Sequence, residues 1–149
     1  MREKLPRIAS VKALTGLHLT VCFEDGWEAE VDLAGFVDGF PSLAPLRDGV
    51  LFRKVAVEEW GSGVTWDNEG PLSIAATTLY RLAAEQAGEP ARRFDAWMIT
   101  NGLSATRAAE ALGMTRRSIV SYRTGERPVP PYINLACIGW ETVRGKQAA

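Results

Sequence analysis

The stretch AEALGMTRRSIVSYRTGERPVP, residues 109–130, contains two segments of helical character separated by a glycine. Ala109 lies four residues before Gly113, where two crossing helices come close and only a small side chain fits. Ile119 lies six residues after Gly113 and is expected to face back toward the core. This spacing predicts a helix, a tight glycine turn and a second helix, which is the helix-turn-helix arrangement.

The ends of both helices carry the residues that favour helix termini. Ser104 precedes the first helix and Thr115 the second, and their hydroxyl groups suit the N-cap position. Met114 before the cap and Ile119 at the fourth helical position predict a hydrophobic staple. Gly125 follows the second helix, where it favours the left-handed conformation that ends a helix.

Two further helices are expected on either side of this pair. The stretch PARRFDAWMITNG, residues 90–102, forms one, and Pro130-Pro131 opens the other. The core-facing residues of the first are expected to be Phe94, Trp97 and Met98. Those of the last are expected to be Tyr132, Leu135, Ala136 and either Trp140 or Val143.

The segment AEALGMTRRSIVSYRTGERPVP resembles the lambda-repressor-like helix-turn-helix family. The resemblance lies in the glycine turn, in Ile119, in the aromatic Tyr122 and in GERP after the second helix, and it covers roughly residues 91–143. It implies a DNA-binding helical domain. Because Ala105 and Arg116 stand where that family often has two glutamines, no base preference is carried over.

Arg116 and Arg117 stand at the start of the second helix, where positive charge opposes the helix dipole at a cost of about 0.3–1 kcal/mol. In helix-turn-helix proteins this end enters the major groove, and a bidentate arginine–guanine contact contributes about 1–3 kcal/mol of discrimination. We therefore expect the helix from Arg116 to Arg123 to read DNA. Its outer face is expected to present Thr115, Arg116, Arg117 and Ser121, with phosphate contacts from Arg107, Arg123 and Arg127. The alternative is that these arginines are simply solvated.

The net charge of −1 hides a difference between the two parts of the chain. Residues 1–89 contain 8 Lys and Arg against 14 Asp and Glu, a net charge of −6, whereas residues 90–149 contain 9 against 4, a net charge of +5. Between them, Gly88 can end one helix and Pro90 can begin the next. We therefore expect two domains, 1–88 and 89–149, and a polyanionic partner for the second.

The stretch LHLTVCFEDGWEAEVDL, residues 17–33, alternates apolar and polar residues and predicts a β-hairpin. A two-residue Asp25-Gly26 turn would set the two apolar faces out of phase. A three-residue loop that also includes Glu24 keeps them together and places Gly26 where a left-handed residue is favoured. This preferred register pairs Phe23 with Trp27, Val21 with Ala29 and Leu19 with Val31.

The rest of the first part predicts a small α+β unit. RIASVKAL, FRKVAVEEW and GVTWD are expected to be strands, and SLAPLRD a short helical turn. LSIAATTLYRLAAEQAG predicts a helix with Ser73 as a possible cap and with Leu79, Leu82 and Ala83 facing inward. The expected fold class is α+β, with a small antiparallel-sheet-plus-helix domain followed by an all-α helix-turn-helix domain.

Two stretches of this part, HLTVCFEDGWEAEVDL and FRKVAVEEWGSGVTWDNEGPLSIAATTLY, resemble in their order a small bacterial domain family of unknown function, numbered 2442. The resemblance covers roughly residues 5–85. It implies a fold and no chemistry.

Catalytic or metal-binding patterns are not evident, and we expect no catalytic residue, cofactor or metal. His18 is the single histidine and alternates with the apolar face of its strand, while Cys22 and Cys137 are far apart and are expected to be reduced. The phosphate-binding glycine loop and the GxSxG motif are also missing from the sequence. Carboxylates near Trp60 and Trp66, expected to be solvated, are Glu58, Glu59, Asp67 and Glu69.

These observations predict a sequence-specific DNA-binding protein that regulates transcription in the bacterial cytoplasm. The sequence contains no run of about 18 apolar residues and no secretory signal. The expected partners are double-stranded DNA and a second copy of the chain, because two-fold pairing doubles the site. The first domain could supply the dimer contact, bind a protein partner or sense a ligand. The alternatives are a protein-interaction module, such as the antitoxin-like member of a two-protein pair, and an enzyme that uses the carboxylates around Trp66.

Overall fold

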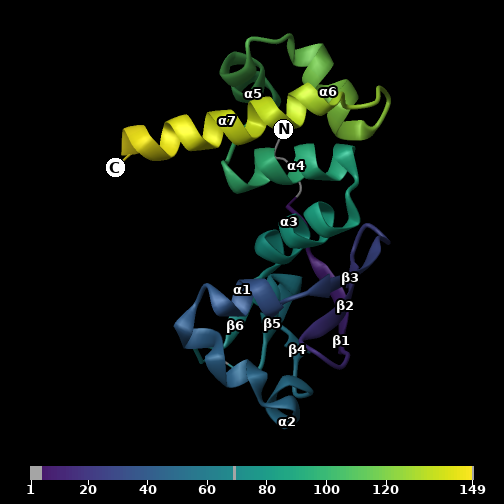
Figure 1. Cartoon of the computed structure of the whole chain (residues 1–149). Coiled ribbons are helices and arrows are strands. Elements are labelled where there is room, and N and C mark those ends of the chain that lie inside the picture. Colours follow the sequence, from purple (N-terminus) through teal and green to yellow (C-terminus); the bar gives the residue numbers. More distant parts are fainter. Residues whose placement is uncertain (1–4, 69, 149) are drawn as a thin grey trace. The chain divides into compact units, whose positions relative to one another are not determined.

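The computed structural model describes residues 5–68 and 70–148. They divide into two compact units, the first ending at Ala87 and the second beginning at Gly88. The first unit contains antiparallel sheets and helices, and the second is helical (Figure 1). The α+β fold class predicted from the sequence is confirmed.

Within the described residues, the first unit contains two three-stranded antiparallel sheets, ordered β1-β2-β3 and β4-β5-β6. The strands are β1 (Ile8–Ala13), β2 (His18–Phe23), β3 (Glu28–Asp32), β4 (Ala56–Val57), β5 (Gly63–Thr65) and β6 (Ser73–Ala75). The helices are α1 (Ala34–Asp38), the 3-10 helix η1 (Pro41–Arg47), α2 (Gly49–Phe52), the 3-10 helix η2 (Glu59–Gly61) and α3 (Ala76–Ala87).

The β2–β3 hairpin has the three-residue loop predicted from the sequence. The register pairs Leu19 with Val31 and Val21 with Ala29, and the Phe23 N–H donates to the Trp27 carbonyl oxygen over 2.8 Å. This register places the apolar side chains of both strands on one face, where Leu19, Val21, Phe23 and Val31 are buried.

Replacing Gly26 by Val is expected to lower the free energy of unfolding by about 1 kcal/mol or more. Gly26 has a φ of +95°, a conformation that strains a β-branched residue, whereas a Cβ there would meet no atom within 4 Å. The loss is therefore conformational and not steric. Urea unfolding measures it, and Gly35→Ala is a matched control because its position is equally open and its φ is not positive. Equal loss of stability in both variants would contradict the prediction.

The helix predicted for LSIAATTLYRLAAEQAG begins later than expected. Residues Ser73–Ala75 form β6, in which Ile74 pairs with Val64, and α3 begins at Ala76. Ser73 is therefore a strand residue, and its predicted capping role is wrong. Leu82 is only half-buried, whereas the buried residues of α3 are Ala76, Leu79, Tyr80, Ala83 and Ala84.

The strand predicted for FRKVAVEEW is also shorter than expected. Only Ala56 and Val57 form β4, because Phe52 ends α2 and Glu59–Gly61 turns into a 3-10 helix. At this turn Gly61 has a φ of +68°, and a Cβ there would lie 2.6 Å from the carbonyl oxygen of Ile8. Close packing against β1 therefore requires a glycine at this turn.

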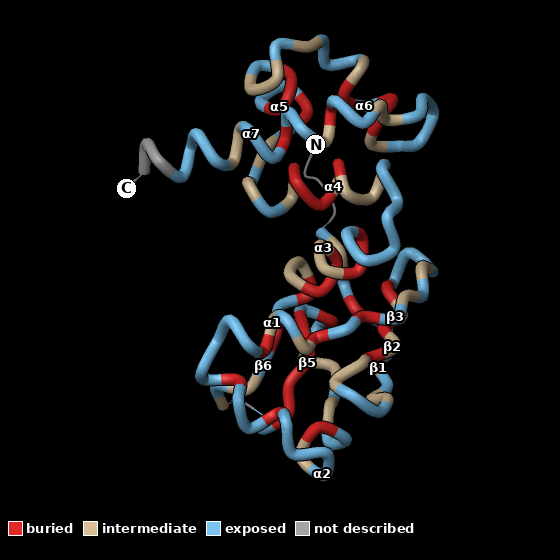
Figure 2. Tube along the Cα trace, viewed as in Figure 1, coloured by how far each residue is buried: buried red, intermediate tan, exposed pale blue. Residues whose placement is uncertain are grey.

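The second unit, coloured by burial in Figure 2, consists of four helices within the described residues, and buried residues occur on each of them. The helices are α4 (Pro90–Thr100), α5 (Ala105–Leu112), α6 (Arg116–Thr124) and α7 (Pro131–Ala148). Their helical core cluster is formed by Phe94, Trp97, Met98, Ala105, Ala108, Ala109, Ile119, Tyr122, Ile133 and Cys137. The three core residues predicted for α4 are therefore confirmed.

The core face predicted for α7 is wrong. Ile133 and Cys137 are buried and Trp140 packs against the core cluster, as one of the two alternatives proposed. The exposed side chains are instead Tyr132, Leu135, Ala136 and Val143. Apolar residues occur on both sides of this helix, so their spacing alone did not identify the side that packs.

Candidate nucleic-acid interface

Side-chain caps and a left-handed glycine shape the turn between α5 and α6. The Ser104 hydroxyl oxygen accepts a hydrogen bond from the Arg107 N–H, and the Thr115 hydroxyl oxygen accepts one from the Ser118 N–H, each over 3.1 Å. Gly113 ends α5 with a φ of +67° and a ψ of +39°. These features confirm both predicted N-caps and the glycine turn.

Buried contacts fix the orientation of α6. Ile119 is fully buried and Tyr122 nearly so, and the Tyr122 ring meets the Phe94 ring edge to face with centroids 5.9 Å apart. Ala109 of α5 is buried in the same core cluster, as its small size predicted. Because these residues hold the inner side of α6, the opposite side is presented to solvent.

The outer face of α6 differs from the predicted one at a single position. Thr115, Arg116 and Arg117 are exposed, as expected. Ser121 is only 6% exposed, so its predicted place on the outer face is wrong. At about 100° per residue, Ser121 lies closer to Arg117 than to Ile119, so the helix period alone does not account for its burial. Its carbonyl oxygen accepts a hydrogen bond from the Arg127 N–H over 3.2 Å, which holds the segment after α6 beside it.

Val120, and not Ser121, lies on the outer face of α6 together with the two arginines. It follows Arg116 by four residues, which puts both on one face of a helix. Its side chain is 37% exposed. The spacing from Arg116 is the sequence signal for this position, although an apolar residue next to the buried Ile119 does not by itself suggest an exposed site.

Arg123 is engaged within the helical unit. Its guanidinium Nε donates to the Asp95 carboxylate of α4, and both side chains are largely shielded from solvent. The pair joins α6 to α4 across 28 residues of sequence. The predicted phosphate contact would have to compete with this ion pair, so Arg123 is better explained as a structural residue.

Arg107 and Arg127 have different surroundings. The Arg127 guanidinium lies 5.3 Å from the centre of the Tyr122 ring, and its Nη1 donates to the Ser118 hydroxyl over 3.4 Å. Both arginines are exposed. The contacts of Arg127 orient its side chain beside α6, while its exposed position leaves room for a phosphate.

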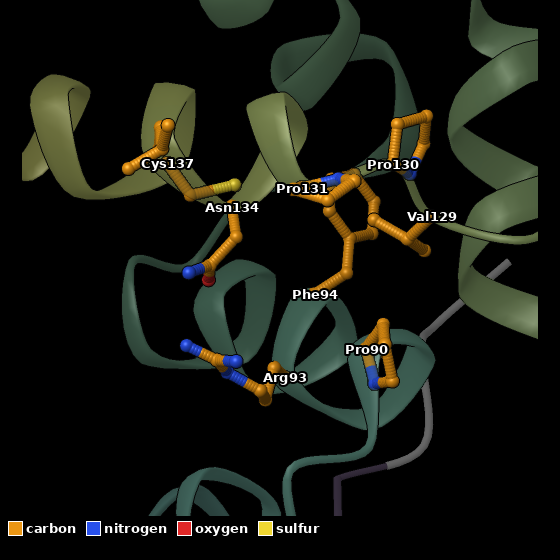
Figure 3. Close-up of a pocket in the computed structure, with 9 residues that line it drawn as sticks. Pro90, Arg93, Phe94, Val129, Pro130, Pro131, Asn134 and Cys137 are labelled. Carbon is orange, nitrogen blue, oxygen red and sulfur yellow. The ribbon is translucent and has the colours of Figure 1, made fainter.

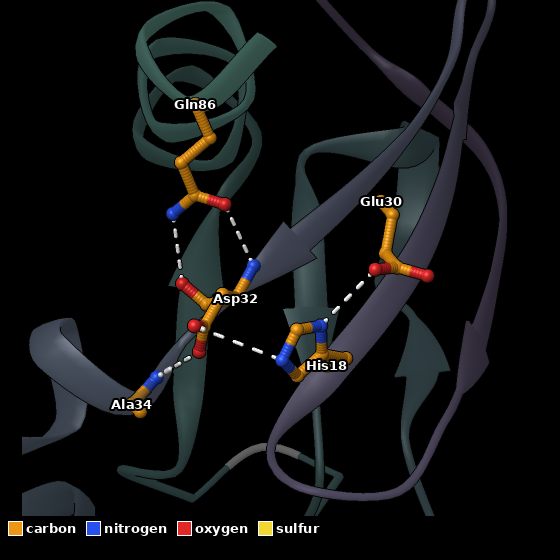
Figure 4. Close-up of polar contacts among 5 residues, drawn as sticks. All are labelled: His18, Glu30, Asp32, Ala34 and Gln86. Carbon is orange, nitrogen blue, oxygen red and sulfur yellow. Dashed lines mark hydrogen bonds and ion pairs between the residues drawn. The ribbon is translucent and has the colours of Figure 1, made fainter.

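The single histidine belongs to an exposed polar cluster on the β2–β3 hairpin (Figure 4). His18 Nδ1 lies 3.2 Å from Glu30 Oε2, and its Nε2 lies 3.7 Å from Asp32 Oδ2. The main chain of Asp32 exchanges two hydrogen bonds of 2.8 Å with the Gln86 side chain, which links β3 to α3. The cluster therefore supports the fold of the first unit.

Among the carboxylates near Trp60 and Trp66, Asp67 has structural contacts, whereas Glu58 is half-buried and Glu59 is exposed. Asp67 accepts hydrogen bonds from the Leu72 N–H at 3.0 Å and from the Thr65 hydroxyl at 3.3 Å. Glu69 lies outside the described residues. Across residues 5–68 and 70–148, no group of three His, Cys, Asp or Glu side chains is arranged to hold a metal ion.

Comparison with known proteins gives two matches. The family model described as "Protein of unknown function (DUF2442)" matches residues 8–85. A crystal structure from Nitrosomonas europaea, of a protein described as a candidate DNA-binding protein, matches with a TM-score of 0.64 and 39% sequence identity. That match covers 97% of this chain and 92% of the other chain. The curated proteins contain no match.

Helix length and hydropathy give one further result. In the described part of the chain, no helix is both long enough and apolar enough for a membrane crossing.

Proposed function

The chain belongs to the DUF2442 family, whose description assigns no activity, and we propose that this member binds double-stranded DNA sequence-specifically and regulates transcription. The observation that carries the proposal is the pair Arg116 and Arg117, exposed at the N-terminal end of α6. Neither guanidinium has a hydrogen-bond or ion-pair partner among the described residues. The neighbour described as a candidate DNA-binding protein supports the same function.

In the proposed complex the N-terminal end of α6 enters the major groove. Arg116 and Arg117 then face base edges, where a guanidinium can donate two hydrogen bonds to guanine O6 and N7. Val120 lies on the same exposed face and suits an apolar contact with a thymine methyl group. Thr115 acts differently, because its hydroxyl already caps α6 and fixes the angle at which the helix presents these side chains.

Phosphate contacts in this proposal come from Arg107 and Arg127. Both are exposed. Arg107 belongs to the first turn of α5 and Arg127 follows the end of α6, so one precedes and the other follows the proposed reading helix along the chain. The net charge of +5 over residues 90–149 favours the approach of a polyanion.

The proposed functional unit is a homodimer, because one helix-turn-helix unit reads few base pairs and two-fold pairing doubles the site. Large apolar side chains that are half or more exposed on α7 support a protein contact there. Apart from Leu135, they are Tyr132, Ile138 and Val143.

Selection of duplexes from a random pool by the full chain tests the proposal. We expect enriched sequences with guanine-containing half-sites related by two-fold symmetry, with centres about 10 base pairs or a multiple apart. Affinity for the selected duplex should fall steeply between about 50 and 200 mM salt, since phosphate contacts release counterions. If no sequence is enriched and the full chain does not bind random duplex at low salt, the proposal is overturned and the interaction-module alternative is favoured.

A further inference from the structure

The helical unit contains a cavity of about 320 Å³ that the proposed DNA contact does not use. It lies between the first turns of α4 and α7 and the segment that leads into α7 (Figure 3). Its volume falls within the range of small-molecule sites. Its apolar walls are formed by Pro90, Phe94, Val129, Pro130, Pro131 and Leu135.

Two polar side chains interrupt these apolar walls. Arg93 and Asn134 both line the cavity, and both are half-buried. Figure 3 shows the Asn134 amide and the Arg93 guanidinium on the same side of the cavity. Neither side chain has a hydrogen-bond or ion-pair partner among the described residues. Among the described residues that line the cavity none is acidic, so the charge of Arg93 is not compensated by them.

Four of the six apolar wall residues have little freedom to move. The centroid of the Phe94 ring lies 5.6 Å from that of Trp97 and 5.9 Å from that of Tyr122, and these contacts anchor Phe94 in the core cluster. Pro90, Pro130 and Pro131 have fixed φ angles. The cavity is therefore formed before any ligand arrives, which lowers the entropic cost of binding.

We propose that this cavity binds a small monocarboxylic acid with an apolar body, such as a medium-chain alkanoate or an arylalkanoate. The carboxylate accepts two parallel hydrogen bonds from the Arg93 guanidinium, the geometry that this group favours. The Asn134 amide N–H donates to one of the same oxygens. The hydrocarbon lies against Phe94 and Leu135. A dianion such as phosphate suits the site less well, because among the described lining side chains only the Cys137 thiol, a weak donor, is left for its remaining oxygens.

Calorimetric titration of the full chain with octanoate tests this site, with 1-octanol as the uncharged probe. We expect saturable 1:1 binding of octanoate. Arg93→Gln should weaken it by roughly tenfold or more, since a charge-assisted bidentate contact is lost. Arg92→Gln is the matched control: it removes the same charge from the adjacent residue, which does not line the cavity, and should leave the affinity unchanged.

Leu135→Trp provides a second, independent variant. Leu135 lines the cavity but is 66% exposed, so a larger side chain can be accommodated without disturbing the core. The tryptophan should obstruct the apolar part of the site and lower the affinity for octanoate, although Arg93 is retained. Circular dichroism melting checks that each variant is folded.

Two results would overturn the proposal: absence of octanoate binding to the parent protein, or equal octanoate affinity in the parent and in folded Arg93→Gln. Octanol affinity that equals that of octanoate would also contradict it, because the guanidinium would then contribute nothing. All titrations are made without DNA. A failure of this site is therefore distinct from a failure of the proposed DNA-binding function.

Discussion

Replacement of Arg116 and Arg117 together by alanine is expected to weaken binding to the selected DNA site by roughly 2–6 kcal/mol, taking about 1–3 kcal/mol for each base contact. Both side chains are exposed, so their removal opens no cavity in the core cluster. Both also oppose the dipole of α6, so the melting temperature should be unchanged or slightly higher. The variant thus separates DNA binding from stability.

A matched control exists in the first unit. Arg53 and Lys54 are adjacent and exposed, and changing both to alanine removes the same charge at a distance in sequence from α6. This control should keep most of its specific affinity. Fluorescence anisotropy with the selected duplex and with a scrambled one measures both variants. If the Arg116/Arg117 variant binds the selected site like the parent, the assignment of α6 as the reading helix is wrong.

Features set by neighbouring residues could be predicted from the sequence. The caps at Ser104 and Thr115 and the left-handed Gly26 and Gly113 depend on contacts or dihedral angles within a few residues. Hydroxyl groups and glycines are favoured at such positions for local physical reasons. The turn geometry and the hairpin register therefore followed from local patterns.

Features set by packing partners far along the chain could not be predicted in the same way. Ser121 is buried although it lies four residues after the exposed Arg117, and Arg123 is paired with Asp95, 28 residues earlier. Ile74 forms a strand because Val64 lies beside it, although the local composition favours a helix. In each case a tertiary contact overrides the local preference.

The cavity also depends on packing between residues that are far apart along the chain. Arg93, Val129 and Asn134 come from three separate segments, and no sequence motif joins them. On α7, apolar residues occur on both sides, so only the packing against α4 and α5 shows that Ile133 and Cys137 are inside. Site residues that depend on such convergence require the structure.

Adjacent aspartate substitutions should separate folding from DNA contact most sharply. Ile119→Asp is expected to unfold the helical unit, because Ile119 is 0% exposed and a carboxylate there would be unpaired among apolar side chains. Loss of the buried side chain alone costs about 2–5 kcal/mol, and the stability of a whole domain is only about 5–15 kcal/mol. DNA binding is then lost as a consequence of unfolding.

Val120→Asp introduces the same charge one residue later and is the matched control for folding. Val120 is 37% exposed, so its carboxylate stays hydrated and the melting temperature should remain close to that of the parent. On the proposed reading face, however, the new negative charge is repelled by DNA phosphates, so specific binding should fall even though the protein is folded. Circular dichroism at 222 nm follows helix content and anisotropy follows binding. A parent-like melt for Ile119→Asp would show that Ile119 does not hold the core, whereas parent-like binding by folded Val120→Asp would place the DNA contact elsewhere than on this face of α6.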